Sequence, residues 1–127
     1  MTLILWSGKN GEMMFNHRRC SRDRAVIEDV LSMYAPAHLC VSAYSAALFE
    51  GACVIGDLAD AKGKVLFLED FPLGSALDQA KKVIVYRFDR TYPADVRLEI
   101  PQSFSLTESL VLSGFSHDKI TREVYVK

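Results

Sequence analysis

The chain has 127 residues, half of them hydrophobic, and a formal net charge of -1 at pH 7. This length allows one domain with a single core and argues against two. The near-zero charge disfavours nucleic acid as a partner, and no apolar run approaches the roughly 20 residues that span a bilayer. Three widely spaced cysteines argue against a disulfide framework or a zinc site and favour a reducing cytoplasm.

The first half of the chain predicts short strands around one amphipathic helix. Residues 3–6 are expected as a first strand rather than as part of a signal peptide. The helix should begin near Ser21 or Asp23, both good N-cap residues, and should end at Pro36. Its apolar residues recur at helical spacing: Val26, Ile27, Val30, Leu31 and Tyr34. Four further segments are expected in this half: strands at 39–41 and 53–55, a short helix at 42–49, and a polar, exposed excursion at 57–63.

Residues 64–95 carry the strongest structural signal. Residues 65–68 form a continuous apolar run, which is typical of a strand covered on both faces. Residues 74–81 then predict a short helix with Leu77 buried, and residues 83–88 predict a second strand. A strand, a helix and a strand form a right-handed parallel unit, and we expect its two strands to be direct neighbours.

The last third of the chain predicts antiparallel strands. Residues 96–100 alternate as in a half-buried strand, and residues 104–111 and 121–126 are expected to pair across a turn-like segment at 113–118. Ser116, His117 and Asp118 cannot form a catalytic triad by themselves, because triad members converge from distant positions. The predicted fold is one α/β domain over residues 1–127, with a mixed, mostly parallel sheet flanked by helices.

A basic segment at the start of the predicted helix is the sharpest functional signal. It contains His17, Arg18, Arg19, Arg22 and Arg24. A helix N-terminus favours an anion, and guanidinium groups bind phosphate or carboxylate with two parallel hydrogen bonds. We therefore expect Arg18, Arg19 and Arg22 to converge on one small anionic ligand. The alternative is a solvated charged loop, partly neutralised by Asp23, Glu28 and Asp29.

Glu69 and Asp70 follow the predicted strand at 65–68. In open α/β sheets ligands bind at the carboxyl ends of the strands, so both residues are candidate ligand-binding residues. They could act as an acid and a base, or hold Mg²⁺ through water. The alternative is that Asp70 caps the next helix or pairs with an arginine. The sequence predicts no dedicated metal site.

The order of these elements resembles the dihydrofolate reductase family, best in the C-terminal half. The segments that carry this resemblance are 83–87, 91–95 and 120–125. More weakly, residues 3–6, the turn at Gly11 and a helix that starts with Asp23 resemble the family's first strand, its mobile loop and its substrate-side helix. The resemblance implies that Asp23 is the catalytic acid.

The chain departs from the family pattern at the cofactor motifs. Glu69 and Asp70 stand where the family has two adjacent glycines beside the cofactor pyrophosphate, and the Gly-Arg-x-Thr motif is replaced by residues 42–46, which contain no arginine. Each like-charge contact at about 4 Å costs roughly 1 kcal/mol even in water. We therefore expect no NADPH, and the cofactor is left open.

The predicted function is a diverged dihydrofolate reductase-like domain that binds a small anionic ligand, nucleotide-like or pterin-like, at the basic helix start. One alternative is an NADPH-dependent reductase of pterins or flavin precursors. Another is an interaction module of the inhibitor or immunity type, which would bind a protein partner. Whether the chain is an enzyme stays open.

Overall fold

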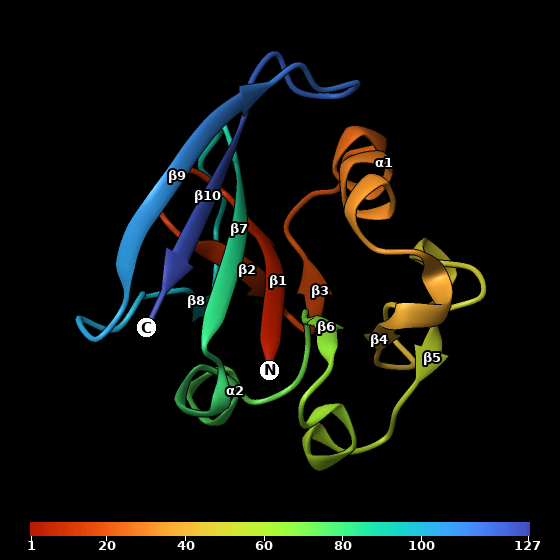
Figure 1. The fold of residues 1–127 in the computed structure, drawn as a ribbon. Helices are drawn as coiled ribbons and strands as arrows, with labels where there is room; N and C mark the ends of the chain where they lie inside the picture. Colours follow the sequence, from red (N-terminus) through yellow and green to blue (C-terminus); the bar gives the residue numbers. More distant parts are fainter.

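The computed structural model describes all residues, 1–127, and is built around one seven-stranded sheet (Figure 1). In spatial order its strands are β5 (Cys53–Val54), β4 (Leu39–Val41), β6 (Val65–Phe67), β1 (Thr2–Ser7), β7 (Lys82–Phe88), β10 (Ile120–Val126) and β9 (Ser105–Leu112). The strands from β5 to β7 are parallel, whereas β10 is antiparallel to both β7 and β9. The predicted mixed, mostly parallel sheet is confirmed.

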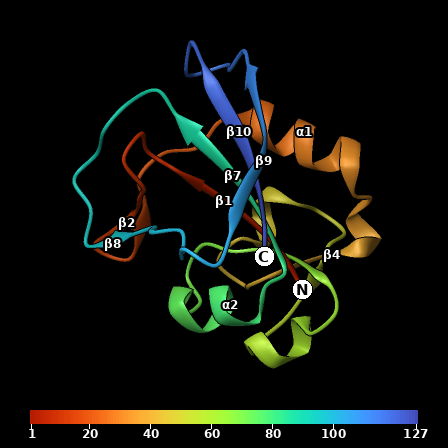
Figure 2. The same ribbon diagram turned by 60° about the vertical axis from the view of Figure 1, so that its left-hand side comes forward.

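A second, small sheet is set apart from the main one (Figure 2). It contains β3 (Arg18–Arg19), β2 (Glu12–Phe15) and β8 (Val96–Arg97), all antiparallel. The strand predicted at 96–100 corresponds to β8, which is only two residues long. Its register with β2 is irregular, and beyond Arg97 the backbone N–H of Leu98 donates to Gly11 O. This small sheet forms one wall of the candidate site.

Helices cover both faces of the main sheet. The predicted amphipathic helix is α1 (Arg24–Met33), which begins after its N-cap Asp23 and ends at Tyr34, just before Pro36. The predicted short helix is α2 (Leu73–Gln79). Three single-turn 3-10 helices complete the structure: η1 (Pro36–His38), η2 (Ala46–Leu48) and η3 (Leu58–Ala61).

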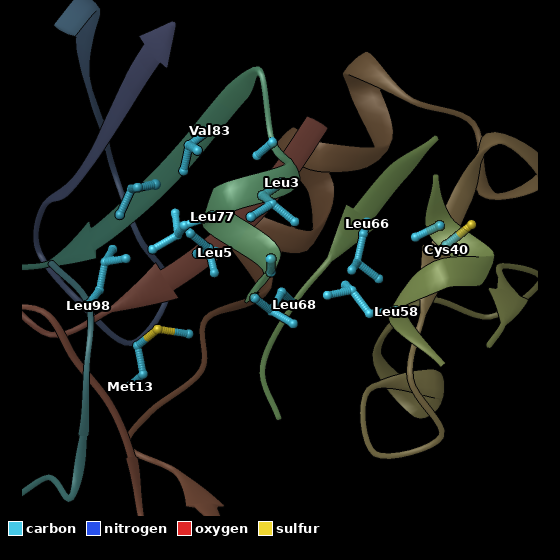
Figure 3. Packing of buried hydrophobic residues seen from close by; sticks show 14 of the residues in the cluster. Leu3, Leu5, Met13, Cys40, Leu58, Leu66, Leu68, Leu77, Val83 and Leu98 are labelled. Atoms are coloured by element: carbon cyan, nitrogen blue, oxygen red, sulfur yellow. The ribbon is translucent and has the colours of Figure 1, made fainter. Parts of the chain in front are cut away.

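Alternating side chains of β1 place a hydrophobic core on each face of the sheet. Leu3 and Leu5 point to the α2 side, while Ile4 and Trp6 point to the α1 side, as the two-residue period of a strand requires. All four are buried. Figure 3 shows Leu77 of α2 packed against Leu3 and Leu5, so its predicted burial is confirmed.

Three predicted elements need correction. The strands at 65–68 and 83–88 are parallel, but they are not neighbours, because β1 lies between them and pairs with both. A crossover helix can bridge one intervening strand, so the local pattern did not fix the strand order. The helix predicted at 42–49 is only the single turn η2. The excursion at 57–63 is not wholly exposed, since Leu58 and Ala61 of η3 are buried.

Candidate functional site

The largest cleft of the protein, about 710 Å³, lies at the carboxyl ends of β4 and β6. The start of α2 forms one side of it, and the small sheet forms the other. Its polar and aromatic lining, which we call the carboxylate cleft, comprises His17, Tyr44, Glu69, Asp70, Phe71 and Asp95. Three of the residues predicted from the sequence, His17, Glu69 and Asp70, are therefore brought together here.

Glu69 is held in place by Arg19. Arg19 Nε donates to Glu69 Oε2 at 2.7 Å, and its guanidinium lies 4.5 Å from the centre of the Tyr44 ring. The backbone N–H of Arg19 also donates to the Tyr44 hydroxyl at 2.8 Å. Burial raises the pKa of Glu69 above its usual range, and the hydrogen bond and charge of Arg19 only partly offset this. Arg19 therefore fixes one wall of the cleft.

Asp70 neither caps the next helix nor pairs with an arginine, the two structural alternatives to a ligand-binding role. Its Oδ1 accepts a hydrogen bond from Ser42 Oγ at 2.6 Å, and the N-cap of α2 is Pro72. The arginine partner expected for Asp70 is instead on Glu69. Asp70 is exposed and lines the cleft, so its carboxylate is accessible to a ligand there.

The turn between β2 and β3 places His17 at the cleft. Asn16 and His17 both have positive φ, 49° and 64°, as the two central residues of a tight hairpin require. The backbone N–H of Asn16 donates to Asp95 Oδ2 at 3.0 Å, which ties this turn to the chain before β8. With Asp95, three carboxylates line the cleft, and one of them, Glu69, is paired with the guanidinium of Arg19.

The structure does not bring Arg18, Arg19 and Arg22 to one point. Arg18 and Arg19 lie in β3, whereas we expected them at the helix start. Arg18 is exposed, Arg19 is bound to Glu69, and Arg22 lies at a different cleft. The reason is the hairpin at Asn16, which turns the basic segment back against β2.

Arg22 lies at a second cleft of about 430 Å³, on the α1 side of the sheet. We call it the arginine cleft, and it includes Arg22, Asp23, Arg24, Ile27, Phe115 and Ser116. The guanidinium of Arg24 lies 4.5 Å from the centre of the Phe115 ring and 3.6 Å from Glu28 Oε2. The other expected neutralising residue, Asp29, instead binds Arg122 of β10 at 2.7 Å and accepts from the Tyr86 hydroxyl at 2.5 Å.

Asp23, the predicted catalytic acid, is buried and fully engaged. Its carboxylate accepts hydrogen bonds from the backbone N–H groups of Ala25, Phe115, Ser116 and His117, at 2.8 to 3.1 Å. His117 Nδ1 lies 3.0 Å from its Oδ2. Burial alone would raise the pKa of Asp23, but these hydrogen bonds outweigh burial and lower the pKa to about 2. Asp23 therefore caps α1 and fastens the 113–118 segment to it.

Gly114 makes this attachment possible. A Cβ atom at this position would lie only 2.7 Å from Asp23 Oδ2 and would collide with His117 O. The chain can pass this close to the carboxylate only without a side chain.

His117 was expected from the sequence only as part of a turn-like segment, but it lies at the centre of a buried hydrogen-bond network. It is buried, and its ring stacks on Phe88 with centroids 4.2 Å apart. Its Nε2 lies 2.9 Å from the Tyr92 hydroxyl and 3.2 Å from Ser21 Oγ. Ser21 and Asp23 precede it by 96 and 94 residues, so no local pattern could have connected them.

Comparison with known proteins supports the fold alone. No protein-family model matches the chain, and no curated protein matches it in sequence. Among solved structures, dihydrofolate reductase from Enterococcus faecalis, complexed with NADP(H) and RAB-propyl, superimposes with a TM-score of 0.69 at 9% sequence identity. The match covers 99% of this chain and 95% of that enzyme. None of the helices here is long and apolar enough to cross a membrane. The superposition shows that the chain has a diverged dihydrofolate reductase-like fold.

Proposed function

We propose that this domain binds a small amino-substituted heterocycle, pterin-like or nucleobase-like, in the carboxylate cleft. The observation that carries the proposal is the acidic lining of the cleft: Glu69, Asp70 and Asp95 line it, and of these three carboxylates only Glu69 has an ion-pair partner, Arg19. Carboxylates accept hydrogen bonds and cannot donate them at neutral pH. A ligand with N–H donors or a positive charge suits this lining better than an anion does.

The volume and aromatic lining of the cleft also suit a partly apolar heterocycle. Its volume of about 710 Å³ is large enough for a small organic molecule. The rings of Tyr44 and Phe71 line it, and an aromatic face gives a heterocycle a surface for stacking. Aromatic and apolar side chains with a few placed polar groups are the usual lining of a small-molecule site.

The polar groups of the cleft are positioned before any ligand arrives. Arg19 holds Glu69, and Ser42 holds Asp70. Groups that are already fixed lose little conformational entropy on binding, so more of the interaction energy is retained as affinity.

Phosphorylated ligands should bind poorly at this place. A phosphate that comes within about 4 Å of one of these carboxylates meets a repulsion of roughly 1 kcal/mol even when water screens it, and more where water is excluded. The arginines provide no shared anion site in compensation, because Arg18 is exposed, Arg19 is bound to Glu69 and Arg22 lies at the other cleft.

Thermal-shift assays with matched ligand pairs test the proposal. Pterin should stabilise the protein more than folate, and adenosine more than adenosine 5′-phosphate. A ligand at a hundredfold excess over its Kd adds about 2.7 kcal/mol of stability, which such an assay detects. Asp70→Asn should weaken the response, while Asp78→Asn on the exposed side of α2 should not. Equal responses from the two variants, or a preference for the phosphorylated ligand, would contradict the proposal.

A second candidate keeps the anionic ligand and places it in the arginine cleft. Two guanidinium groups, those of Arg22 and Arg24, line this cleft beside Ser116. Titration with inorganic phosphate should then raise the melting temperature of the protein. Arg22→Ala should abolish that rise, and Arg18→Ala, which changes an exposed arginine outside the cleft, should preserve it. The candidate fails if phosphate has no effect or if both variants respond alike.

A further inference from the structure

Ser21, His117 and Asp23 form a continuous hydrogen-bonded chain. Ser21 Oγ lies 3.2 Å from His117 Nε2, and His117 Nδ1 lies 3.0 Å from Asp23 Oδ2. An ionised carboxylate only accepts hydrogen bonds, so the ring proton is on Nδ1 and the lone pair of Nε2 faces Ser21. His117 and Asp23 are buried, whereas Ser21 is partly exposed.

We propose that Ser21 is a nucleophile for acyl transfer, with His117 as its general base and Asp23 as the group that orients the imidazole. A hydroxyl within hydrogen-bond reach of a base, itself oriented by a third group, is the arrangement by which proteins activate serine. It is recognised by geometry and roles rather than by the order of residues in the chain. This site is separate from the carboxylate cleft and does not depend on a ligand there.

The surroundings hold the imidazole rigidly in this orientation. Asp23 is fixed by the backbone N–H groups of the 115–117 segment, and Phe88 stacks on the ring with 13° between the planes. A base that is already oriented needs no reorganisation when the proton moves.

A donor for the developing negative charge is also present. The backbone N–H of Arg22, the residue after the nucleophile, makes no hydrogen bond within the protein. In serine hydrolases of the α/β type, the N–H that follows the nucleophile contributes to the oxyanion hole.

Tyr92 restrains the site in its resting state. Its hydroxyl lies 2.9 Å from His117 Nε2, closer than Ser21 Oγ does. One lone pair on Nε2 cannot fully serve two hydroxyl donors, so the phenol competes with Ser21 for the base. Removing the Tyr92 hydroxyl should therefore increase the reactivity of Ser21.

The arginine cleft, which begins at the next residue, indicates the class of substrate. Arg22 and Arg24 suit a carboxylate or a phosphate, and Ile27 and Phe115 suit an apolar part. The substrate would be an ester that carries a negative charge. Ser21 Oγ bonds to the carbonyl carbon and gives its proton to His117 Nε2, and the alcohol leaves with that proton. Water then cleaves the acyl-serine bond, which releases the carboxylic acid and returns a proton to Ser21.

Labelling with a biotinylated fluorophosphonate tests the nucleophile directly. The Ser21 oxygen should bond to phosphorus as fluoride leaves, and tryptic mass spectrometry of the wild-type protein should find the label on Ser21. Ser21→Ala should reduce labelling at least a hundredfold. Ser32→Ala, at an exposed serine of α1, should leave it unchanged, and Tyr92→Phe should label several times faster.

Three results would overturn the proposal. They are an unlabelled wild-type protein after hours in excess probe, a label on any other residue, and equal labelling of Ser21→Ala. Because the site is mapped on the wild-type protein, the outcome does not depend on how well the variants fold.

The substrate class has its own test. The p-nitrophenyl ester of succinate should be cleaved faster than that of acetate, and Arg24→Ala should remove the difference. If both esters react equally in the wild-type protein, the assignment of an anionic ester is wrong. Neither readout involves the carboxylate cleft, so this proposal and the ligand-binding proposal can fail separately.

Discussion

Replacing Arg19 with methionine should destabilise the fold by about 3 kcal/mol at neutral pH. The side chain of Glu69 is only 1% exposed, and Arg19 is its ion-pair partner at 2.7 Å. Removing one partner of a buried ion pair typically costs 3–5 kcal/mol, because the other charge is left without compensation. Arg19 itself is 22% exposed, so water can partly replace it, and we expect a value near the lower limit.

The loss should depend on pH in a defined direction. Burial already raises the pKa of Glu69 above its reference value of 4.5, and without Arg19 the pKa should rise further. A carboxyl group whose pKa is higher in the folded state favours folding while it is protonated, and this stability is lost as the pH rises through the folded pKa. The deficit of Arg19→Met relative to wild type should therefore be small near pH 4 and complete near pH 8.

Urea unfolding followed by circular dichroism at both pH values measures this deficit. In a separate thermal unfolding experiment, a loss of about 3 kcal/mol should lower the melting temperature by roughly 10 °C in a domain of this size. Arg18→Met, at the exposed neighbouring position, should change stability by less than about 0.5 kcal/mol. Adding Glu69→Gln to Arg19→Met should recover much of the loss, since no buried charge then remains. A loss below about 1 kcal/mol at pH 8, or one that does not vary with pH, would refute this account of the pair.

Three further predictions concern other parts of the molecule. Leu77→Ala should cost about 2–5 kcal/mol in urea unfolding, because Leu77 is buried between α2 and β1; a change below about 1 kcal/mol would show that the helix does not depend on this contact. The pKa of Asp23 is lowered from 3.8 to about 2, so its ionised form should contribute about 2 kcal/mol at neutral pH, and acid titration of Asp23→Asn against wild type should show this difference vanishing as the pH falls towards 2. NADPH should not bind at micromolar concentrations, because the carboxylates of Glu69 and Asp70 at the carboxyl end of β6 would repel its pyrophosphate; a calorimetric Kd below roughly 10 μM would favour the reductase alternative.

The elements with strong local patterns could be predicted from the sequence. The apolar runs of β1 and β7 identified two strands, and the approximate bounds of α1 followed from Ser21 or Asp23 as N-cap and from Pro36 beyond its end. Each of these signals depends on residues that are close together in the sequence, where side-chain periodicity and backbone sterics act directly. The resemblance to dihydrofolate reductase depended on the order of these same elements.

The contacts that build the candidate sites could not be predicted in this way. Arg19 was expected at a helix start, because a hairpin with positive φ at Asn16 and His17 has no clear sequence signal when neither residue is glycine. Its partner Glu69 lies 50 residues away. The position of His117 beside Asp23 likewise arises because the 113–118 segment packs against the start of α1. The periodicity of hydrophobic residues carries no information about such a contact.

The central place of β1 has a consequence for synthesis of the protein. This first strand pairs with β6 and β7, whose residues follow it by about sixty to eighty positions. At roughly 5–20 residues per second, a ribosome needs several seconds or more to produce those partners. During that time the buried side chains Leu3, Ile4, Leu5 and Trp6 have no strand to pair with. Strand β1 is therefore an unpaired apolar segment during synthesis, and slower translation of residues 8–64 should increase aggregation.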